Sequence, residues 1–234
     1  MPVILTRRAT HLREFMDDPH CDQKLLYNTY RQFASVNRLV SRWQTVYRRF
    51  IKPKLSPERT TTLLDIGFGG GDVPLLVDRM AKADDLKLSI TGIETDPRAL
   101  EYTSRMAWPD SITLKHASTT ELVRQRRRYD LVISNHLLHH LDENELRQLT
   151  SEAQQLANRR IVFNDIHRGD LAWMAFTLTR PFYRNSFITA DGLRSIRRSY
   201  TTGELKALLP EYWFVQPVFP YRLIAGYDVP NAES

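Results

Sequence analysis

The chain of 234 residues can bury the core of one large α/β domain, and its 42% hydrophobic and 26% charged content excludes wholesale disorder. The single cysteine, Cys21, excludes an intrachain disulfide framework and a thiolate zinc cluster, and it fits a reducing compartment. The net charge of +6 would suit RNA or an anionic substrate, but the basic residues are scattered along the chain, which favours an ordinary basic surface.

The amino-terminal residues lack the apolar stretch of a secretory signal, and no apolar run approaches the length of about 18 residues that spans a bilayer. We therefore expect a cytoplasmic protein with no membrane span. Residues 22–51 carry apolar side chains at helical spacing, and Asp22 is a suitable N-cap. This segment predicts one helix or two before the first strand.

From residue 61 onward, short apolar strands alternate with helices. Strands are predicted at residues 62–66, 88–93, 112–114, 129–134 and 160–164. Helices are predicted around Pro74, after Asp96 and after Asp142, where Glu145 completes a capping-box pattern. The alternation predicts an α/β fold with a mainly parallel sheet and helices on both faces.

The last third of the chain changes character. Residues 170–200 are rich in aromatics and arginine and do not continue the alternation. A capping-box pattern at residues 201–204 then predicts a short helix that ends at Pro210. Residues 213–219 and 221–227 are predicted to form an antiparallel hairpin at the edge of the sheet.

A glycine-rich loop, Asp65-Ile66-Gly67-Phe68-Gly69-Gly70-Gly71, follows the first predicted strand. Such a loop lets the backbone approach a ligand closely at the carboxyl end of a parallel sheet. The loop fits the dinucleotide pattern G-x-G-x-x-G poorly, because Asp72 takes the sixth position, where it would face a pyrophosphate. A dinucleotide is therefore disfavoured, and a P-loop motif is absent from the sequence.

Three stretches together resemble the class I S-adenosylmethionine-dependent methyltransferases. Residues 64–71 look like motif I of that family, residues 92–97 are similar to its second motif, and residues 129–141 are similar to its fourth-strand region. The resemblance implies a Rossmann-like, seven-stranded, mainly parallel sheet over residues 56–234. The amino-terminal part, with Met16-Asp17-Asp18-Pro19 and Asn37-Arg38-Leu39, is similar to bacterial small-molecule methyltransferases of polyketide-type pathways.

The resemblance also implies S-adenosylmethionine as cofactor and S-adenosylhomocysteine as product. The glycine loop would pack against the methionine part, with Asp65 near its amino group, and Glu94 would accept hydrogen bonds from both ribose hydroxyls. Adenine would lie beside residues 116–118, where the acid that the family often has is missing, so Ser118 or a backbone group would replace it. The complete expected cofactor set is Asp65, Gly67, Phe68, Gly69, Gly71, Glu94, Thr95, Ala117, Ser118 and Asn135.

The acceptor side is predicted from two neighbouring histidines. His139 and His140 follow the fourth strand, and some small-molecule O-methyltransferases have such a pair here, with an acid after the fifth strand, where Asp165 stands. We hypothesise that one histidine is the general base for a hydroxyl acceptor and that Asp165 orients it or contacts the acceptor. Alternatively, one histidine packs under the sheet or caps the next helix. A metal site with His167 is conceivable, but its spacing is not distinctive and we predict no metal.

Aromatic residues outside the predicted sheet suggest an apolar acceptor pocket. We interpret residues 1–55 as an N-terminal helical cap and residues 170–200 as an inserted cap segment, with the alternative that these aromatics belong to the core. The aromatics concerned are Trp43, Tyr47, Trp173, Phe176, Phe182, Tyr183 and Phe187.

The sequence therefore predicts methyl transfer to a small aromatic or polyketide-like acceptor, as a monomer or a homodimer. Two alternatives remain open at this point. The positive charge would suit a tRNA or rRNA methyltransferase, although an appended RNA-binding module is not evident in the sequence. A non-catalytic protein that binds the cofactor for sensing would also keep the glycine loop and Glu94.

Overall fold

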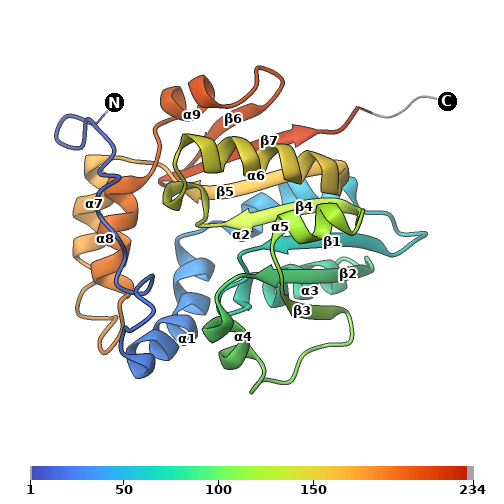
Figure 1. Ribbon diagram of the computed structural model, residues 1–234, viewed down its shortest axis with the longest axis horizontal. Helices are drawn as coiled ribbons and strands as arrows, with labels where there is room; N and C mark the ends of the chain where they lie inside the picture. The colour runs from blue at the N-terminus through green and yellow to red at the C-terminus, as the bar shows by residue number, and fades with distance from the viewer. Residues whose placement is uncertain (1, 231–234) are drawn as a thin grey trace.

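The computed structural model describes residues 2–230 and shows an α/β fold with one central sheet (Figure 1). Its strands are β1 (Thr61–Ile66), β2 (Leu88–Glu94), β3 (Ile112–His116), β4 (Tyr129–Asn135), β5 (Ala157–Ile166), β6 (Phe214–Val218) and β7 (Arg222–Asp228). Its α-helices are α1 (Gln23–Leu39), α2 (Trp43–Val46), α3 (Asp72–Ala83), α4 (Pro97–Thr103), α5 (Thr119–Arg124), α6 (Glu143–Leu156), α7 (Asp170–Thr177), α8 (Ile188–Arg198) and α9 (Thr202–Leu208).

The seven strands lie in the order β3-β2-β1-β4-β5-β7-β6. Strands β1 to β5 pair in parallel, whereas β7 is antiparallel to both β5 and β6. This arrangement confirms the predicted Rossmann-like, mainly parallel sheet. It also confirms the hairpin at the sheet edge, since β6 is the outermost strand.

Helices cover both faces of the sheet because the strands are apolar on both faces. Along β1, the side chain of Leu64 joins a core cluster with α6, α9 and β7, while its neighbour Leu63 joins a second cluster with α2 and α3. The buried pattern of β4 is continuous from Tyr129 to Ser134. The order of strands and the position of their carboxyl ends therefore fix where a ligand can bind.

The predicted capping boxes at the starts of α6 and α9 are confirmed. Asp142 accepts hydrogen bonds from the amides of Asn144 and Glu145, and Thr201 accepts one from Glu204. The helix α5 was not predicted, although Ser118 and Glu121 form a third capping box at its start.

The predicted helical segment 22–51 divides at Arg42, which has a left-handed backbone with φ of 55°. Helix α1 lies before this break, and α2 with a following π-helical turn (Tyr47–Ile51) lies after it. Trp43 and Tyr47 are buried in the core cluster of α2 and α3, against the sheet, so they do not contribute to a pocket as the sequence interpretation allowed.

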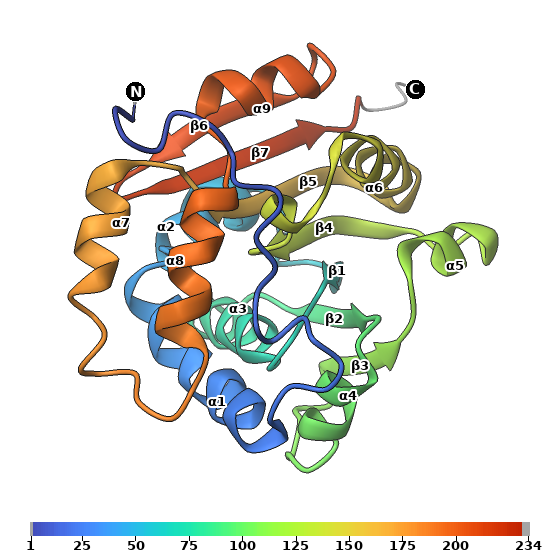
Figure 2. The same cartoon turned by 60° about the vertical axis from the view of Figure 1, so that its left-hand side comes forward.

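The remaining helical elements gather over the carboxyl ends of the parallel strands. Helices α1, α7 and α8 stand at this end of the sheet, and the irregular segment before α1 runs between α8 and the strand ends (Figures 1 and 2). Within residues 2–230, no helix is long and apolar enough to cross a membrane. The cap elements and the strand ends enclose the site described next.

Candidate active site

The glycine loop between β1 and α3 has the conformation that its composition predicts. Gly67, Gly69 and Gly71 all have positive φ values, of 76°, 51° and 76°. Residues with a Cβ rarely adopt this region, so glycine is required for the turn. Gly71 has a further reason, because a Cβ there would meet the indole of Trp108 at 2.3 Å.

Glu94 is held at the end of β2 by backbone amides. Its Oε2 accepts a hydrogen bond from Gly69 N at 3.1 Å, and its Oε1 accepts from Thr95 N at 2.8 Å and Asp96 N at 3.2 Å. These bonds orient the carboxylate rigidly toward the cavity beside the loop. The Oε2 atom keeps acceptor capacity for a further donor.

Asp65, the residue before the last one of β1, has a buried carboxyl group without a partner among the described residues. Both of its side-chain oxygens lack a hydrogen bond among the described residues, and the residue is 1% exposed. Burial and the neighbouring Asp72 and Glu94 carboxylates raise the pKa of Asp65 well above its usual value. A cationic donor from a ligand would remove this electrostatic penalty.

Two adjoining cavities meet at the glycine loop. The larger, of about 470 Å³, extends from the loop to α8, and the smaller, of about 250 Å³, lies beside the turn after β3. Residues Gly67, Glu94 and Leu137 line both. The volumes are in the range of small-molecule sites.

The predicted cofactor residues divide between these cavities. The larger cavity is lined by Asp65, Gly67, Phe68, Gly69, Glu94 and Asn135. The smaller is lined by Gly67, Glu94, Thr95, Ala117 and Ser118. Gly71 lines neither cavity and has a packing role against Trp108 instead.

The structure gives the two predicted histidines different surroundings, although their ring centroids lie only 4.3 Å apart. His139 is 1% exposed and does not line either cavity, whereas the side chain of His140 is 25% exposed and lines the larger one. Both lie on a short 3-10 turn after β4, Leu138–His140. Only His140 can therefore reach a molecule in the cavity without rearrangement.

His139 is enclosed by two carboxylates. Its Nδ1 lies 2.7 Å from Asp165 Oδ1, and its Nε2 lies 3.2 Å from Glu14 Oε1. These carboxylates outweigh burial and raise the pKa of His139 to about 9, so the ring is an imidazolium at neutral pH. The same interaction holds the pKa of Asp165 well below its usual range.

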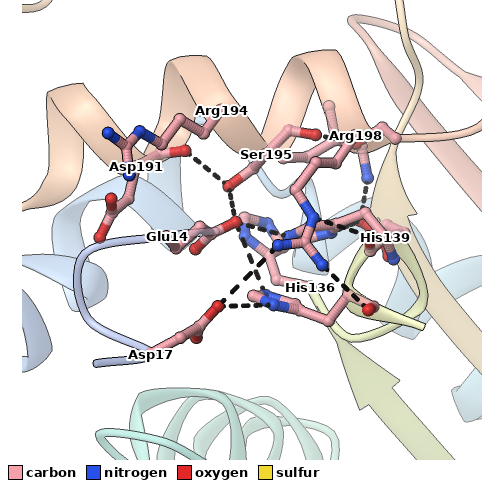
Figure 3. A network of polar contacts seen from close by, with 12 residues as sticks. Glu14, Asp17, His136, His139, Asp191, Arg194, Ser195 and Arg198 are labelled. Carbon is pink, nitrogen blue, oxygen red and sulfur yellow. Dashed lines mark hydrogen bonds and ion pairs between the residues drawn. The ribbon is translucent and has the colours of Figure 1, made fainter. Parts of the chain in front are cut away.

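His140 contacts two carboxylates of the amino-terminal segment. Its Nδ1 lies 3.3 Å from Asp17 Oδ2, and its Nε2 lies 3.6 Å from Glu14 Oε1. Glu14 in turn accepts a hydrogen bond of 2.6 Å from Ser195 Oγ on α8. Figure 3 shows the network drawn from three separate parts of the chain: the amino-terminal segment, α8 and the loop after β4.

Comparison with known proteins agrees with this architecture. Residues 63–160, which include the glycine loop, Glu94 and both histidines, match the family model described as "Methyltransferase domain". This part of the chain is therefore similar to a methyltransferase domain. No curated protein sequence matches the chain.

Several solved methyltransferase structures have a fold similar to that of this chain. The plantazolicin methyltransferase BpumL, solved with a pentazolic desmethylPZN analogue and SAH, is 13% identical with a TM-score of 0.60, and the match covers 92% of each chain. Human N-acetylserotonin methyltransferase, solved with SAM, is 11% identical with a TM-score of 0.63, over 88% of this chain and 56% of that protein. An O-methyltransferase family protein from Burkholderia thailandensis is 14% identical with a TM-score of 0.58, over 85% of this chain and 57% of that one.

The larger cavity is strongly acidic, although the whole chain has a net charge of +6. Arg222 is the one arginine or lysine in the described lining, and burial lowers its pKa to about 10. Seven acidic residues line this cavity: Glu14, Asp17, Asp65, Asp72, Glu94, Asp96 and Asp191. The site therefore favours a cationic ligand over a phosphate.

Sequence reasoning missed several residues of the candidate site. Glu14 and Ser195 were not predicted, since their partners lie 125 and 181 residues away. His136, beside the predicted Asn135, contacts Arg222 Nη1 at 2.9 Å, and burial with the Arg222 charge lowers the pKa of His136 well below its usual value. Of these residues, only His136 could have been found from a local pattern, because it lies in the loop after β4 next to Asn135.

Three side chains of the site lie close enough to approach one cation. The ligand atoms of Glu14, His139 and His140 are all within 4.8 Å of one another. Glu14 already pairs with the ring nitrogens of His139 and His140, so the polar atoms of these three side chains have partners without a metal ion. His167, the residue weighed for a metal from sequence, lines neither cavity and lies 3.4 Å from Thr202 Oγ1.

Proposed function

We propose that the chain transfers a methyl group from S-adenosylmethionine to a hydroxyl group of a small phenolic, quinone-derived or polyketide-like acceptor. The single observation that carries this proposal is the unpartnered Asp65 carboxyl group beside the glycine loop, with the oriented Glu94 carboxylate on the other side. A ligand with an ammonium group at one end and a vicinal diol further along would satisfy both residues.

The cofactor parts fit the two cavities in order. Asp65 would bind the amino group of the methionine part in the larger cavity, and Glu94 would bind the ribose where the cavities meet. Adenine would occupy the smaller cavity beside Ala117. The Ser118 hydroxyl is engaged in the capping box of α5, so backbone groups are better placed than this side chain to contact the adenine amino group.

We propose that His140, which lines the larger cavity, takes the proton of the acceptor hydroxyl. When bound, S-adenosylmethionine supplies a methyl group on an already activated sulfonium leaving group. His140 would take the hydroxyl proton as the oxygen attacks, and the nearby Glu14 and Asp17 carboxylates would stabilise the positive charge on its ring. His139, fixed between Asp165 and Glu14, would position Glu14 rather than touch the acceptor.

The solved structures and the cavity charge support a small acceptor. The similar structures include a plantazolicin methyltransferase, an N-acetylserotonin methyltransferase and an O-methyltransferase family protein. The acidic lining opposes entry of a polyphosphate chain, which disfavours the tRNA and rRNA alternative. Methylation of RNA would instead require a cationic path to the cofactor.

The test separates cofactor binding from proton removal. His140→Gln is expected to keep its affinity for S-adenosylhomocysteine within about threefold and to lose roughly 10²–10⁴-fold in turnover on an alkylphenol. The loss should shrink on a nitrophenol, whose hydroxyl needs no base at neutral pH. His167→Gln, the same change outside both cavities, serves as the control.

Other outcomes would contradict parts of the proposal. An equal defect of His140→Gln on acidic and ordinary phenols would remove the general-base role. Tight cofactor binding by the native chain without turnover on phenol, hydroquinone or polyketide panels would favour the non-catalytic sensor. Unchanged affinity for S-adenosylhomocysteine in Asp65→Asn and Glu94→Gln would overturn the cofactor site itself.

A further inference from the structure

Large apolar side chains are concentrated on the surface at one end of the molecule. Within the described residues, most large hydrophobic side chains that are more than half exposed lie on α7, on the turn that follows it or on two segments beside it. These are Val3, Ile4, Leu171, Met174, Leu178, Phe182 and Phe219, which we call the α7 patch. Tyr212 is the one such residue outside it.

Hydrogen bonds hold the three parts of the α7 patch near one another: the amino-terminal residues, α7 with its following turn, and the β6–β7 turn. Asp170, the first residue of α7, accepts hydrogen bonds from the amides of Val3, Ile4 and Leu5. His167 N donates to Tyr221 O at 2.9 Å, which fixes the β6–β7 turn near the start of α7. Figures 1 and 2 both show α7 at the outer edge of the cap, beside α8.

Helix α7 is apolar on both of its faces. Leu171, Met174 and Leu178 follow one another at helical spacing on the exposed side. The opposite side, with Ala172, Ala175, Phe176 and Thr179, lines the larger cavity. A helix of this kind needs an apolar partner on its outer face as well as on its inner one.

The charge of the same segment indicates the kind of partner. Residues 171–190 contain no aspartate or glutamate, while Arg180 and Arg184 stand exposed in the turn between α7 and α8. Exposed apolar side chains flanked by arginines, on a chain of net charge +6, complement an anionic lipid surface. Apolar insertion and electrostatic attraction are the two signals that reversible membrane binding requires.

We propose that the α7 patch docks the protein on an anionic lipid bilayer, with Leu178 and Phe182 inserted among the acyl chains and Arg180 and Arg184 at the headgroups. In this orientation the outer face of α7 lies against the lipid, while its inner face lines the larger cavity. If the methyl transfer proposed above is correct, a lipophilic acceptor could then pass between the bilayer and the cavity along α7. The docking itself does not depend on that activity.

The first experiment measures binding of the full chain to vesicles. Co-sedimentation is expected with vesicles of phosphatidylcholine and phosphatidylglycerol at 7:3, and much less with phosphatidylcholine alone. The double variant Arg180→Gln/Arg184→Gln should lower the partition coefficient on anionic vesicles by roughly 25-fold, about fivefold for each arginine. The double variant Leu178→Ser/Phe182→Ser should lower it at least tenfold on the same vesicles.

Controls distinguish docking from misfolding and self-association. Tyr212→Ser, an exposed apolar-to-polar change outside the patch, should bind vesicles like the native chain. All of these side chains are exposed, so unchanged far-UV circular dichroism and thermal unfolding are expected. Trp173 on α7 offers a local probe, since brominated lipid should quench the native chain more than Trp173→Phe.

Two results would overturn the proposal. Equal, weak sedimentation of the native chain with both vesicle types would show that the α7 patch does not bind lipid. A concentration-dependent dimer in light scattering that Phe182→Ser abolishes, without vesicle binding, would assign the patch to a second copy of the chain. Neither readout requires turnover, so failure of docking and failure of the proposed methyl transfer are separately visible.

Discussion

At the scale of single residues, Asp65 has the most informative environment. It combines complete burial, two unpartnered oxygens and a pKa raised well above the usual value. A carboxyl group in this state is protonated more readily than a carboxylate that is paired with an ammonium group. Binding of an ammonium-bearing ligand should therefore require Asp65 to lose a proton.

Affinity for S-adenosylhomocysteine is expected to rise with pH between 5 and 7. Burial raises the pKa of Asp72 to about 6, so this residue titrates in the same pH range and makes the affinity depend more steeply on pH. Asp65→Asn should weaken binding by about 10–100-fold and flatten the pH dependence. Titration calorimetry in two buffers of different ionisation enthalpy gives the number of protons released. Asp110→Asn on the surface is the matched control, and an unchanged slope in Asp65→Asn would assign the proton to another group.

The pair His139 and His140 shows what a sequence cannot specify at this scale. Both residues are identical in type and adjacent, and the pattern Leu138-His139-His140-Leu141 treats them alike. The 3-10 turn sends one side chain into the buried contact with Asp165 and the other into the cavity. Only the direction of the Cα–Cβ bonds, which depends on the folded turn, separates their roles.

At the scale of elements, local patterns predicted most of the fold. Five parallel strands, the edge hairpin and two capping boxes follow from apolar runs and from residues spaced three apart. The break in the helix at Arg42 was harder to predict, because residue type alone does not indicate that a non-glycine residue has a positive φ. Helix α5 was missed even though Ser118 and Glu121 have the capping spacing, because the segment is too short to show apolar periodicity.

The amino-terminal segment is an element that no local pattern predicted. It has no regular secondary structure at residues 12–16, and α8 holds it through side chains. Asp191 accepts from Phe15 N at 2.7 Å and from Met16 N at 3.0 Å, and Arg198 Nη1 donates to Leu12 O at 2.7 Å. Such a segment is stable only as long as these few contacts persist.

Weakening the contacts with α8 should loosen this segment without unfolding the sheet. In Asp191→Ala/Ser195→Ala, amide hydrogen exchange at residues 12–17 is expected to accelerate at least tenfold, since the amides of Phe15 and Met16 lose their acceptor and Glu14 loses the Ser195 donor. Exchange in β4 and β5 should stay unchanged. The variant should lose more in turnover than in cofactor affinity, because Glu14 contacts His140. Uniformly faster exchange across the chain would instead indicate global destabilisation.

At the scale of the whole molecule, the ion pairs of His139 link stability to pH. The folded chain raises the pKa of His139 from 6.5 to about 9. Because the folded state holds this proton more tightly than an unfolded chain does, the contribution is complete below pH 6.5. It is lost as the pH rises through about 9.

The free energy of unfolding is therefore expected to fall by up to roughly 3 kcal/mol between pH 6 and pH 9. His139→Gln should be less stable than the native chain at pH 6 and should lose less stability on going to pH 9. Urea denaturation at pH 6, 7.5 and 9 measures both. His20→Gln changes an exposed histidine and should keep the native dependence of the unfolding free energy on pH. If the unfolding free energy of the native chain did not change between pH 6 and pH 9, His139 would be neutral in the folded state.

The site as a whole could be predicted only in part, for a reason of distance along the chain. The cofactor side was accessible because the glycine loop and Glu94 each follow a recognisable strand and carry a distinctive composition. The acceptor side was not, because Glu14, His139 and Ser195 meet only after the chain has folded. A sequence states which residues are neighbours along the chain, and the sheet order decides which become neighbours in space.

The long-range contacts of Glu14 have a consequence for synthesis of the protein. Glu14 leaves the ribosome early, but its partners at positions 139 and 195 follow 125 and 181 residues later. At a translation rate of about 5–20 residues per second, Glu14 waits roughly ten seconds or more for Ser195. The glycine loop and Glu94 can assemble on the nascent sheet before then. A nascent chain could therefore acquire its methyl-donor pocket while the acceptor pocket is still incomplete, so catalytic competence would arrive only near the end of translation.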